Sequence, residues 1–425
     1  MVSYVQINFF MSNIKNLYDV AVVGGGPVGS QVAFKLAGMG HNTIILEKKE
    51  KFTNPICCTG IVSRECVENY SIPDSVIHRW ASSAVLYSPN LTPLHVSRND
   101  PQVAILDRSA FNILWNNRAQ SAGVQIRSGC EVRKIRLDKK IASIDLIYEG
   151  EHQSLQARVV VIAAGFGSWL IDGLGLEGAG DFVMGAQAEV EIRDIKEVEV
   201  YFGRKIAPSF FAWLVPTSGN KALVGLLTRK NPPAYLRSLL SRLKVEGKIV
   251  SDNVSFTYGG VPLKTLPKTY AERVVVVGTT AGQVKPLTGG GIYFGLLCAD
   301  IAANTLGRCL SANDLSADKL SSYQRNWKRR LGRELRTATW ARRIIERLDD
   351  HRIDRVFGLI QSSGLINELS QSKELSFDWH ADVISRVINH RLLVNVFRSM
   401  KLPFHLKARL QRGLKTKSNL SERIS

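Results

Sequence analysis

The chain has 425 residues, 45% of them hydrophobic, which is enough for a large buried core and excludes a disordered protein. Its formal charge of +19 predicts attraction to nucleic acid, to anionic lipid or to a phosphorylated substrate. The longest apolar run of helical pattern, residues 292–303, is interrupted by Asp300 and is shorter than the roughly 20 residues that span a bilayer, so we expect no transmembrane helix.

The amino-terminal segment does not resemble a signal peptide, because it has no positively charged start, no sustained apolar core and no small-residue cleavage site. The folded pattern begins near Leu17, so Met11 is an alternative to Met1 as the start. The six cysteines form no CxxC pair and accompany no paired histidines, which indicates neither a zinc site nor a disulfide framework. We therefore expect no metal and a reducing, cytoplasmic compartment.

The order of the predicted elements indicates an α/β fold. A strand (18–23), a helix up to Gly38 and a strand (42–46) form a βαβ unit of a parallel sheet. Further strands are predicted at 132–137, 141–148 and 158–163. Residues 182–228 alternate as antiparallel strands do, a buried strand returns at 273–278, a helix follows at about 290–306, and residues from Asp314 onward are helical and basic.

These patterns predict a Rossmann-like nucleotide-binding domain made of discontinuous segments, an antiparallel sheet domain for the substrate and a helical carboxyl-terminal region. The nucleotide-binding domain is expected at 17–70, 100–180 and 270–306. The substrate domain is expected at 71–99 and 181–269, and the helical basic region at 307–425.

The turn between the first strand and the first helix carries the sequence GGGPVG. Gly24, Gly26 and Gly29 have the spacing that permits a tight turn, lets the backbone approach a pyrophosphate and packs the helix on the strand. Glu47, at the end of the second strand, is placed to accept a hydrogen bond from a ribose hydroxyl. The sequence therefore predicts one bound dinucleotide, and Pro27 and Lys48 are included in its site.

The stretch PSFFAWLVP, residues 208–216, places aromatic side chains between two prolines. If the segment is extended, Phe211, Trp213 and Val215 lie on one face. Composition alone favours a core strand here.

The distal segment 274–306 resembles the flavin motif of the para-hydroxybenzoate hydroxylase superfold. Together with residues 106–108 and 160–168 it resembles an FAD-binding arrangement, so FAD is the cofactor that we expect. Thr279 stands where that motif has Asp. A threonine can accept a hydrogen bond from a ribitol hydroxyl but brings no negative charge. The resemblance implies these further cofactor-binding residues: Arg108, Ala164, Gly165, Gly278, Thr279, Gly289, Gly290, Gly291 and Ile292.

The aromatic stretch is similar to the PxxYxWxFP signature of geranylgeranyl reductases, with Phe211 in place of Tyr and Val215 in place of Phe. The resemblance implies FAD-dependent saturation of double bonds in an isoprenoid lipid, with Phe211, Trp213 and Pro216 binding the substrate. The electron donor stays open between a ferredoxin, NAD(P)H and others. A monooxygenase or halogenase of the same superfold and a degenerate prenyl-lipid-binding protein are the alternatives.

Two adjacent cysteines, Cys57 and Cys58, occupy the place of a cysteine-glycine segment in that family. The resemblance implies a role for them beside the flavin, either as proton donor or in shaping the reactive end of the substrate. The alternative is that they are small buried hydrophobic residues. The helix that opens near Gly290 is expected to direct its amides at the flavin edge where negative charge grows on reduction.

Basic residues cluster at 326–343 and 401–417. In the second cluster, leucines recur every four residues at Leu402, Leu406, Leu410 and Leu414. This pattern fits peripheral contact with an anionic membrane surface, at its inner face, and it fits a packed amphipathic helix equally well. Nucleic acid is not expected as a partner, because no nucleic-acid-binding module accompanies the charge.

Overall fold

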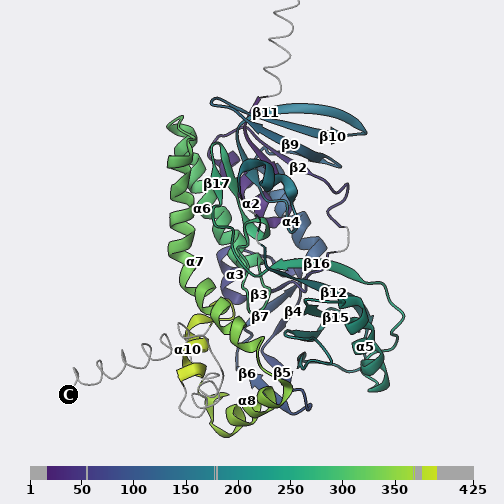
Figure 1. Ribbon diagram of the computed structural model, residues 1–425. Helices are drawn as coiled ribbons and strands as arrows, with labels where there is room; N and C mark the ends of the chain where they lie inside the picture. Colours follow the sequence, from purple (N-terminus) through teal and green to yellow (C-terminus); the bar gives the residue numbers. More distant parts are fainter. Residues whose placement is uncertain are drawn as a thin grey trace, which may run out of the picture.

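The computed structural model describes residues 17–53, 56–176, 178, 180–366, 368 and 376–389. Figure 1 shows two large sheets at opposite ends of the molecule, with the long helix α7 (Ala317–Ile345) along one side. This mixture of parallel and antiparallel sheets with carboxyl-terminal helices confirms the predicted fold class.

The first sheet has eight strands, and its centre is parallel in the order β18, β11, β1, β2, β8. Helices α2 (Pro27–Gly38) and α6 (Ile292–Ser311) pack on one face, where they share a core with the valines of β1 and β11. A second core covers the other face, so the central strands are apolar throughout. The strands are β1 (Leu17–Val23), β2 (Thr43–Glu47), β8 (Gln125–Ser128), β9 (Glu131–Leu137), β10 (Ala142–Tyr148), β11 (Glu151–Ile162), β17 (Tyr270–Ala271) and β18 (Val274–Val276).

The second sheet has seven strands in the order β16, β12, β15, β14, β13, β5, β6. Ala212 and Leu214 of β14 face helix α5 (Pro232–Val245), whereas Phe211 and Trp213 belong to clusters on the other face. The alternation predicted for PSFFAWLVP is therefore present. The strands are β5 (Ser83–Tyr87), β6 (Pro93–Ser97), β12 (Phe182–Glu191), β13 (Val198–Phe202), β14 (Phe211–Pro216), β15 (Lys221–Thr228) and β16 (Thr257–Pro262).

A third sheet of three strands lies between the two large ones (Figure 1). It pairs β7 (Val103–Leu106) with β3 (Ile61–Ser63) and with β4 (Ile77–Ala81). Residues 71–99 contribute to two sheets, because β4 belongs to this small sheet while β5 and β6 join the seven-stranded sheet. Helices α3 (Arg64–Asn69) and α4 (Arg108–Ser121) and the short helix η1 (Asp74–Val76) flank the small sheet.

The carboxyl-terminal region adds helix α8 (Asp350–Ser362) and helix α10 (Ala381–Asn389), which contacts α7. Short 3-10 helices η2 (Trp169–Leu174) and η3 (Gly278–Ala281) follow β11 and β18. Within the described ranges, no helix is both long enough and apolar enough to cross a membrane. The leucine stripe predicted at 402–414 lies outside the described residues.

Candidate functional site

The glycine turn after β1 contains two glycines that the fold itself requires. Gly24 has φ of +107°, and a Cβ there would lie 2.4 Å from the carbonyl oxygen of Ala163. A Cβ at Gly29 would lie 2.0 Å from the carbonyl oxygen of Gly24. These two positions hold β1, α2 and the end of β11 together.

Gly26 is different from its neighbours in the same turn. It is the N-cap of α2 with φ of −69°, and no described atom lies within 4 Å of a Cβ built on it. Pro27 follows as the first residue of the helix. The start of α2 thus presents amides beside open space, which is the arrangement that binds a pyrophosphate.

Glu47 and Lys48 diverge at the end of β2. One Glu47 oxygen accepts the amide of Gly25 at 2.7 Å and the other accepts the amide of Lys49 at 2.9 Å. The Lys48 ammonium is instead 2.8 Å from Glu131, and its side chain is 73% exposed. The Glu47 carboxylate is therefore held against the glycine turn, whereas the Lys48 side chain is mostly exposed at the edge of this turn.

Arg108 opens α4 and lies against Gly60, where a Cβ would be 3.0 Å from Arg108 Cδ. Its Nη2 donates to Asn112 at 3.3 Å. Its Nε and Nη1 are buried and have no hydrogen-bond partner among the described residues. A buried guanidinium with two unused donors fits a site that receives an additional polar group.

Two further loops border this part of the molecule. Ala164 and Gly165 follow β11, and the hydroxyl of Thr280 in η3 donates to the carbonyl of Gly165 at 2.8 Å. Gly278 has φ of +68° and packs against Val28 of α2. Thr279, half-buried beside it, lies in the same short helix.

The second glycine turn, Gly289 to Gly291, leads into Ile292 at the start of α6. Gly291 is the N-cap of α6, and Gly289 has φ of +77°. A Cβ at Gly289 would lie 3.1 Å from Leu227, and one at Gly290 would lie 2.7 Å from Lys285. The turn therefore lies against both the seven-stranded sheet, at Leu227, and the Lys285 side chain.

The sheet face toward this turn is apolar and aromatic. Its cluster joins Phe211 and Trp213 of β14 to Leu227 of β15, with ring centroids of Phe211 and Trp213 6.0 Å apart. Trp213 lies over Gly225, where a Cβ would be 2.5 Å from the indole. Pro216 is buried at the end of the same strand.

Cys57 lies on this face between two glycines. A Cβ at Gly185 or at Gly259 would be 3.6 Å from the Cys57 sulfur, and Gly185 also faces Leu227. Burial raises the pKa of the Cys57 thiol to about 11. Cys58 is half-buried, and its amide donates to the carbonyl of Ile56 at 2.9 Å.

The structure thus brings the second glycine turn and Cys57, which were both predicted from the sequence, to the two sides of Leu227. Leu227 packs against Gly289 of the second glycine turn and against Gly185, which also lies beside Cys57. The sequence does not single out Leu227, which lies in the stretch 182–228 that was predicted to form antiparallel strands.

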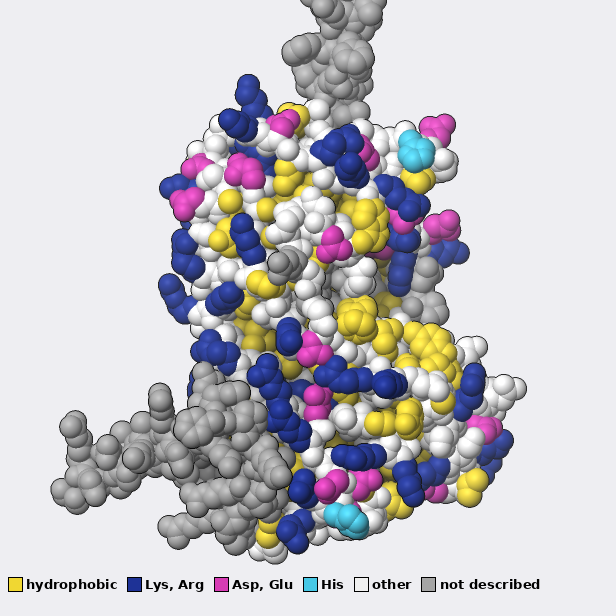
Figure 2. Space-filling model, viewed as in Figure 1, with side chains coloured by type: hydrophobic (Ala, Val, Ile, Leu, Met, Phe, Trp, Pro, Cys, Tyr) yellow, Lys and Arg dark blue, Asp and Glu magenta, His cyan; other side chains and the backbone are white. Residues whose placement is uncertain are grey.

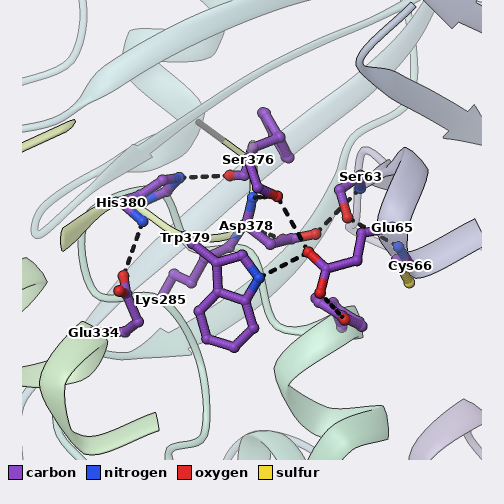
Figure 3. Close-up of polar contacts among 11 residues, drawn as sticks. Ser63, Glu65, Cys66, Lys285, Glu334, Ser376, Asp378, Trp379 and His380 are labelled. Carbon is purple, nitrogen blue, oxygen red and sulfur yellow. Dashed lines mark hydrogen bonds and ion pairs between the residues drawn. The ribbon is translucent and has the colours of Figure 1, made fainter. Parts of the chain in front are cut away.

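A polar network behind the second glycine turn was also missed (Figure 3). Lys285 Nζ and Asp378 Oδ1 are 2.5 Å apart, and the Trp379 indole donates to Glu65 at 2.8 Å. Lys285 lies in the flavin-like segment and carried a usable signal, as the one charged residue between Arg273 and Asp300. No sequence signal pointed to Asp378.

Figure 2 shows Lys and Arg side chains spread over one face, with a group of hydrophobic side chains over β12 and β16. The exposed aromatic residues of these strands include Phe182, at 46%, and Tyr258, at 53%. The Phe166 ring, from the loop after β11, is 5.3 Å from that of Phe182. This apolar surface borders Gly259, which contacts Cys57.

Comparisons with known proteins show which proteins the chain as a whole resembles. A family model described as lycopene cyclase protein matches residues 19–362. The chain is 28% identical over 357 residues to a digeranylgeranylglycerophospholipid reductase of Methanocaldococcus jannaschii, covering 81% of this chain and 90% of that protein. It is 27% identical over 359 residues to the protein of that name from Methanococcus vannielii, covering 81% and 91%.

Solved structures share the fold. A geranylgeranyl bacteriochlorophyll reductase-like protein of Thermoplasma acidophilum superposes with a TM-score of 0.79 at 22% identity, covering 91% of this chain and 100% of that one. A flavin-dependent halogenase superposes with a TM-score of 0.62 at 17% identity, covering 87% and 76%.

Proposed function

The chain belongs to the lycopene cyclase protein family, and from that premise we propose that it is an FAD-dependent reductase that saturates carbon–carbon double bonds of a geranylgeranyl or related isoprenoid lipid. The relatives named digeranylgeranylglycerophospholipid reductase support this reaction and this substrate class. The observation that carries the proposal is the contact of Leu227 with both the second glycine turn and the wall that holds Cys57.

The residues that would hold FAD come from separate segments. The amides at the start of α2 beside Gly26 would bind the pyrophosphate, and Glu47 would accept a ribose hydroxyl, since its carboxylate is already held at the turn. The unused donors of Arg108 would hydrogen-bond to the cofactor. Ala164, Gly165, Gly278 and Thr279 border the same site, and Lys48 lies at its rim.

The second glycine turn would receive the flavin ring. When bound and reduced, FAD supplies a hydride to one carbon of the double bond. The amides at the start of α6, from Gly290 to Ile292, would stabilise the negative charge of the reduced ring, because a helix N-terminus carries a partial positive charge.

The chain must also supply a proton and position an apolar alkene. We assign the proton to Cys57, because its pKa of about 11 keeps the thiol protonated at neutral pH. Cys58, next to it, would shape the reactive end. Phe211, Trp213 and Pro216 would form the wall along which the isoprenoid chain lies, so positioning rather than polarity would carry much of the catalysis.

The surface of the molecule fits a lipid substrate. The exposed aromatic side chains at Phe166 and Phe182 border the strand that carries Gly259, and so would admit the chain next to Cys57. The excess of basic residues fits an anionic membrane surface as a peripheral partner.

The test is reduction of a geranylgeranyl lipid by protein reconstituted with FAD and reduced with dithionite. We expect mass to increase in steps of two hydrogens, and we expect Cys57→Ala to lose most of the turnover while retaining FAD. Cys309→Ala, in the last turn of α6 and far from the second glycine turn, is the matched control for the loss of a buried thiol. No mass gain with several prenyl lipids would refute the reductase, and NAD(P)H-dependent oxygen uptake stimulated by an aromatic compound would favour a monooxygenase or halogenase.

A further inference from the structure

A lysine and an aspartate form a buried ion pair behind the second glycine turn. Lys285 Nζ is 2.5 Å from Asp378 Oδ1, and the two side chains are 5% and 3% exposed. The other oxygen of Asp378 accepts the amide of Ser63 at 3.2 Å (Figure 3). Water therefore screens this pair very little.

The lysine is part of the turn itself. Its amide donates to the carbonyl of Gly290 at 3.0 Å, and the amide of Gly289 donates to the carbonyl of Lys285 at 2.9 Å. A Cβ built on Gly290 would lie 3.1 Å from the lysine Nζ. The ammonium is thus held beside the backbone that the proposed function assigns to the flavin ring.

The aspartate comes from the carboxyl-terminal segment before α10, which is anchored on three helices. The Trp379 indole donates to Glu65 of α3 at 2.8 Å, and its ring packs on Phe294 of α6 with centroids 5.6 Å apart. The amide of Ala381 donates to Glu334 of α7 at 2.8 Å. These contacts fix the aspartate carboxylate independently of the lysine.

The nearest other titratable groups do not cancel the pair. Burial, together with the Lys285 ammonium, lowers the pKa of His380 to about 4, so the imidazole is neutral at neutral pH. Burial also raises the pKa of the Cys66 thiol well above its ordinary value. Glu65 and Glu334 are the other carboxylates of the network, and both are unchanged in the variants described below.

We propose that Lys285 and Asp378 act as positioning residues that set the electrostatic potential at the second glycine turn, and through it the reduction potential of the bound flavin. The inference rests on the proposed FAD site. Two-electron reduction takes up two electrons and one proton and leaves the flavin with one additional negative charge. An unbalanced ammonium beside the turn therefore favours the reduced form, and an unbalanced carboxylate disfavours it.

The two single substitutions are expected to act in opposite directions. Asp378→Asn leaves the ammonium unbalanced and should raise the reduction potential, while Lys285→Gln leaves the carboxylate unbalanced and should lower it. We expect each to change the ratio of reduced to oxidised flavin affinity by at least about tenfold, which is about 30 mV for a two-electron couple. The double variant, with both charges removed, should return close to the wild-type potential.

The experiment is a dithionite titration of the FAD-loaded full chain against a reference dye, with oxidised FAD affinity and thermal unfolding measured in parallel. The control pair is Lys221 and Glu189 of the seven-stranded sheet. Lys221 Nζ is 2.7 Å from Glu189 Oε1, but the two side chains are 61% and 55% exposed. Glu189→Gln and Lys221→Gln should leave the potential unchanged.

A purely structural role would weaken FAD binding in both single variants without shifting the potential in opposite senses, and that result overturns the inference. If Lys285→Gln does not fold, Asp378→Asn decides alone, and an unchanged or lower potential overturns it. A wild-type chain that binds no FAD refutes both this inference and the proposed function. A chain that binds FAD but saturates no lipid refutes only the reductase.

Discussion

The first glycine turn allows the cofactor glycine to be separated from the structural ones by two single substitutions. Gly26→Ala adds a methyl group where no described atom lies within 4 Å, at a φ of −69° that alanine adopts freely. Gly29→Ala adds the same group 2.0 Å from the carbonyl oxygen of Gly24. The first change intrudes on the proposed pyrophosphate site, and the second intrudes on the fold.

The expected energies differ accordingly. Alanine is a poorer N-cap than glycine, which destabilises the fold by roughly 0.5–1 kcal/mol. Alanine also lowers the conformational entropy of the unfolded chain, which stabilises the fold by about 0.4–1 kcal/mol. Because the two effects oppose each other, Gly26→Ala should change the free energy of unfolding by less than about 1 kcal/mol. Gly29→Ala forces α2 away from the turn, and overpacking of this kind destabilises by about 1–3 kcal/mol or more. FAD affinity should fall at least about tenfold in Gly26→Ala, which is about 1.4 kcal/mol.

The assay is urea unfolding of the cofactor-free chain together with FAD titration followed by flavin fluorescence. Gly26→Ala should unfold at the wild-type urea midpoint and bind FAD weakly. Gly29→Ala should instead unfold at a lower urea concentration than the wild type. Wild-type FAD affinity in Gly26→Ala would refute the assignment of the pyrophosphate to the start of α2.

Three further predictions concern the aromatic wall, the half-buried Arg108 and the half-buried His380. Trp213→Ala should lower prenyl-lipid turnover and retain FAD. The control is Phe256→Ala, on the α5 face of the same sheet, which should leave turnover unchanged. Loss of flavin in Trp213→Ala would indicate that Trp213 has only a structural role. Arg108→Met should weaken FAD binding at little cost in stability, because its Nε and Nη1 have no partners among the described residues, and wild-type affinity by titration calorimetry would contradict this. Since the pKa of His380 is lowered to about 4, its neutral form stabilises the fold above pH 6.5 and this stability is lost as pH falls toward 4. In denaturant titrations, the free energy of unfolding should fall between pH 7 and pH 4.5 by up to about 3 kcal/mol less in His380→Gln than in the wild type. An equal fall in both proteins would contradict this prediction.

The sequence was sufficient for the parts of the fold that local pattern determines. The glycine spacing after β1 predicted the first βαβ unit, and the all-apolar run at 158–163 predicted a strand buried on both faces. The alternation of Phe211 and Trp213 predicted which side chains share a face of β14. Period and turn chemistry are properties of adjacent residues, and so one sequence reveals them.

Contacts between distant segments were beyond that reasoning. Lys285 and Asp378 are 93 residues apart, and nothing near Asp378 in the sequence distinguishes it from a surface acid. Lys48 was predicted as a cofactor residue from its place beside Glu47, and the sequence did not indicate that its ammonium pairs with Glu131 of β9. Both contacts depend on the whole tertiary fold rather than on adjacent residues.

The glycines of the seven-stranded sheet are the observation that favours a substrate wall over a plain core strand for PSFFAWLVP. A core strand is opposed by side chains that fill the space across from it, but here Trp213 lies over Gly225 and Cys57 lies between Gly185 and Gly259. Glycine weakens a strand interior, so three of them on one face indicate positions where bulk is excluded. The buried indole Nε1 of Trp213 also has no partner among the described residues, which a position selected for stability alone would avoid. The indole and the thiol thus occupy space that side chains at these three glycines would fill, and under the proposed function this face of the sheet is the wall along which the isoprenoid chain lies.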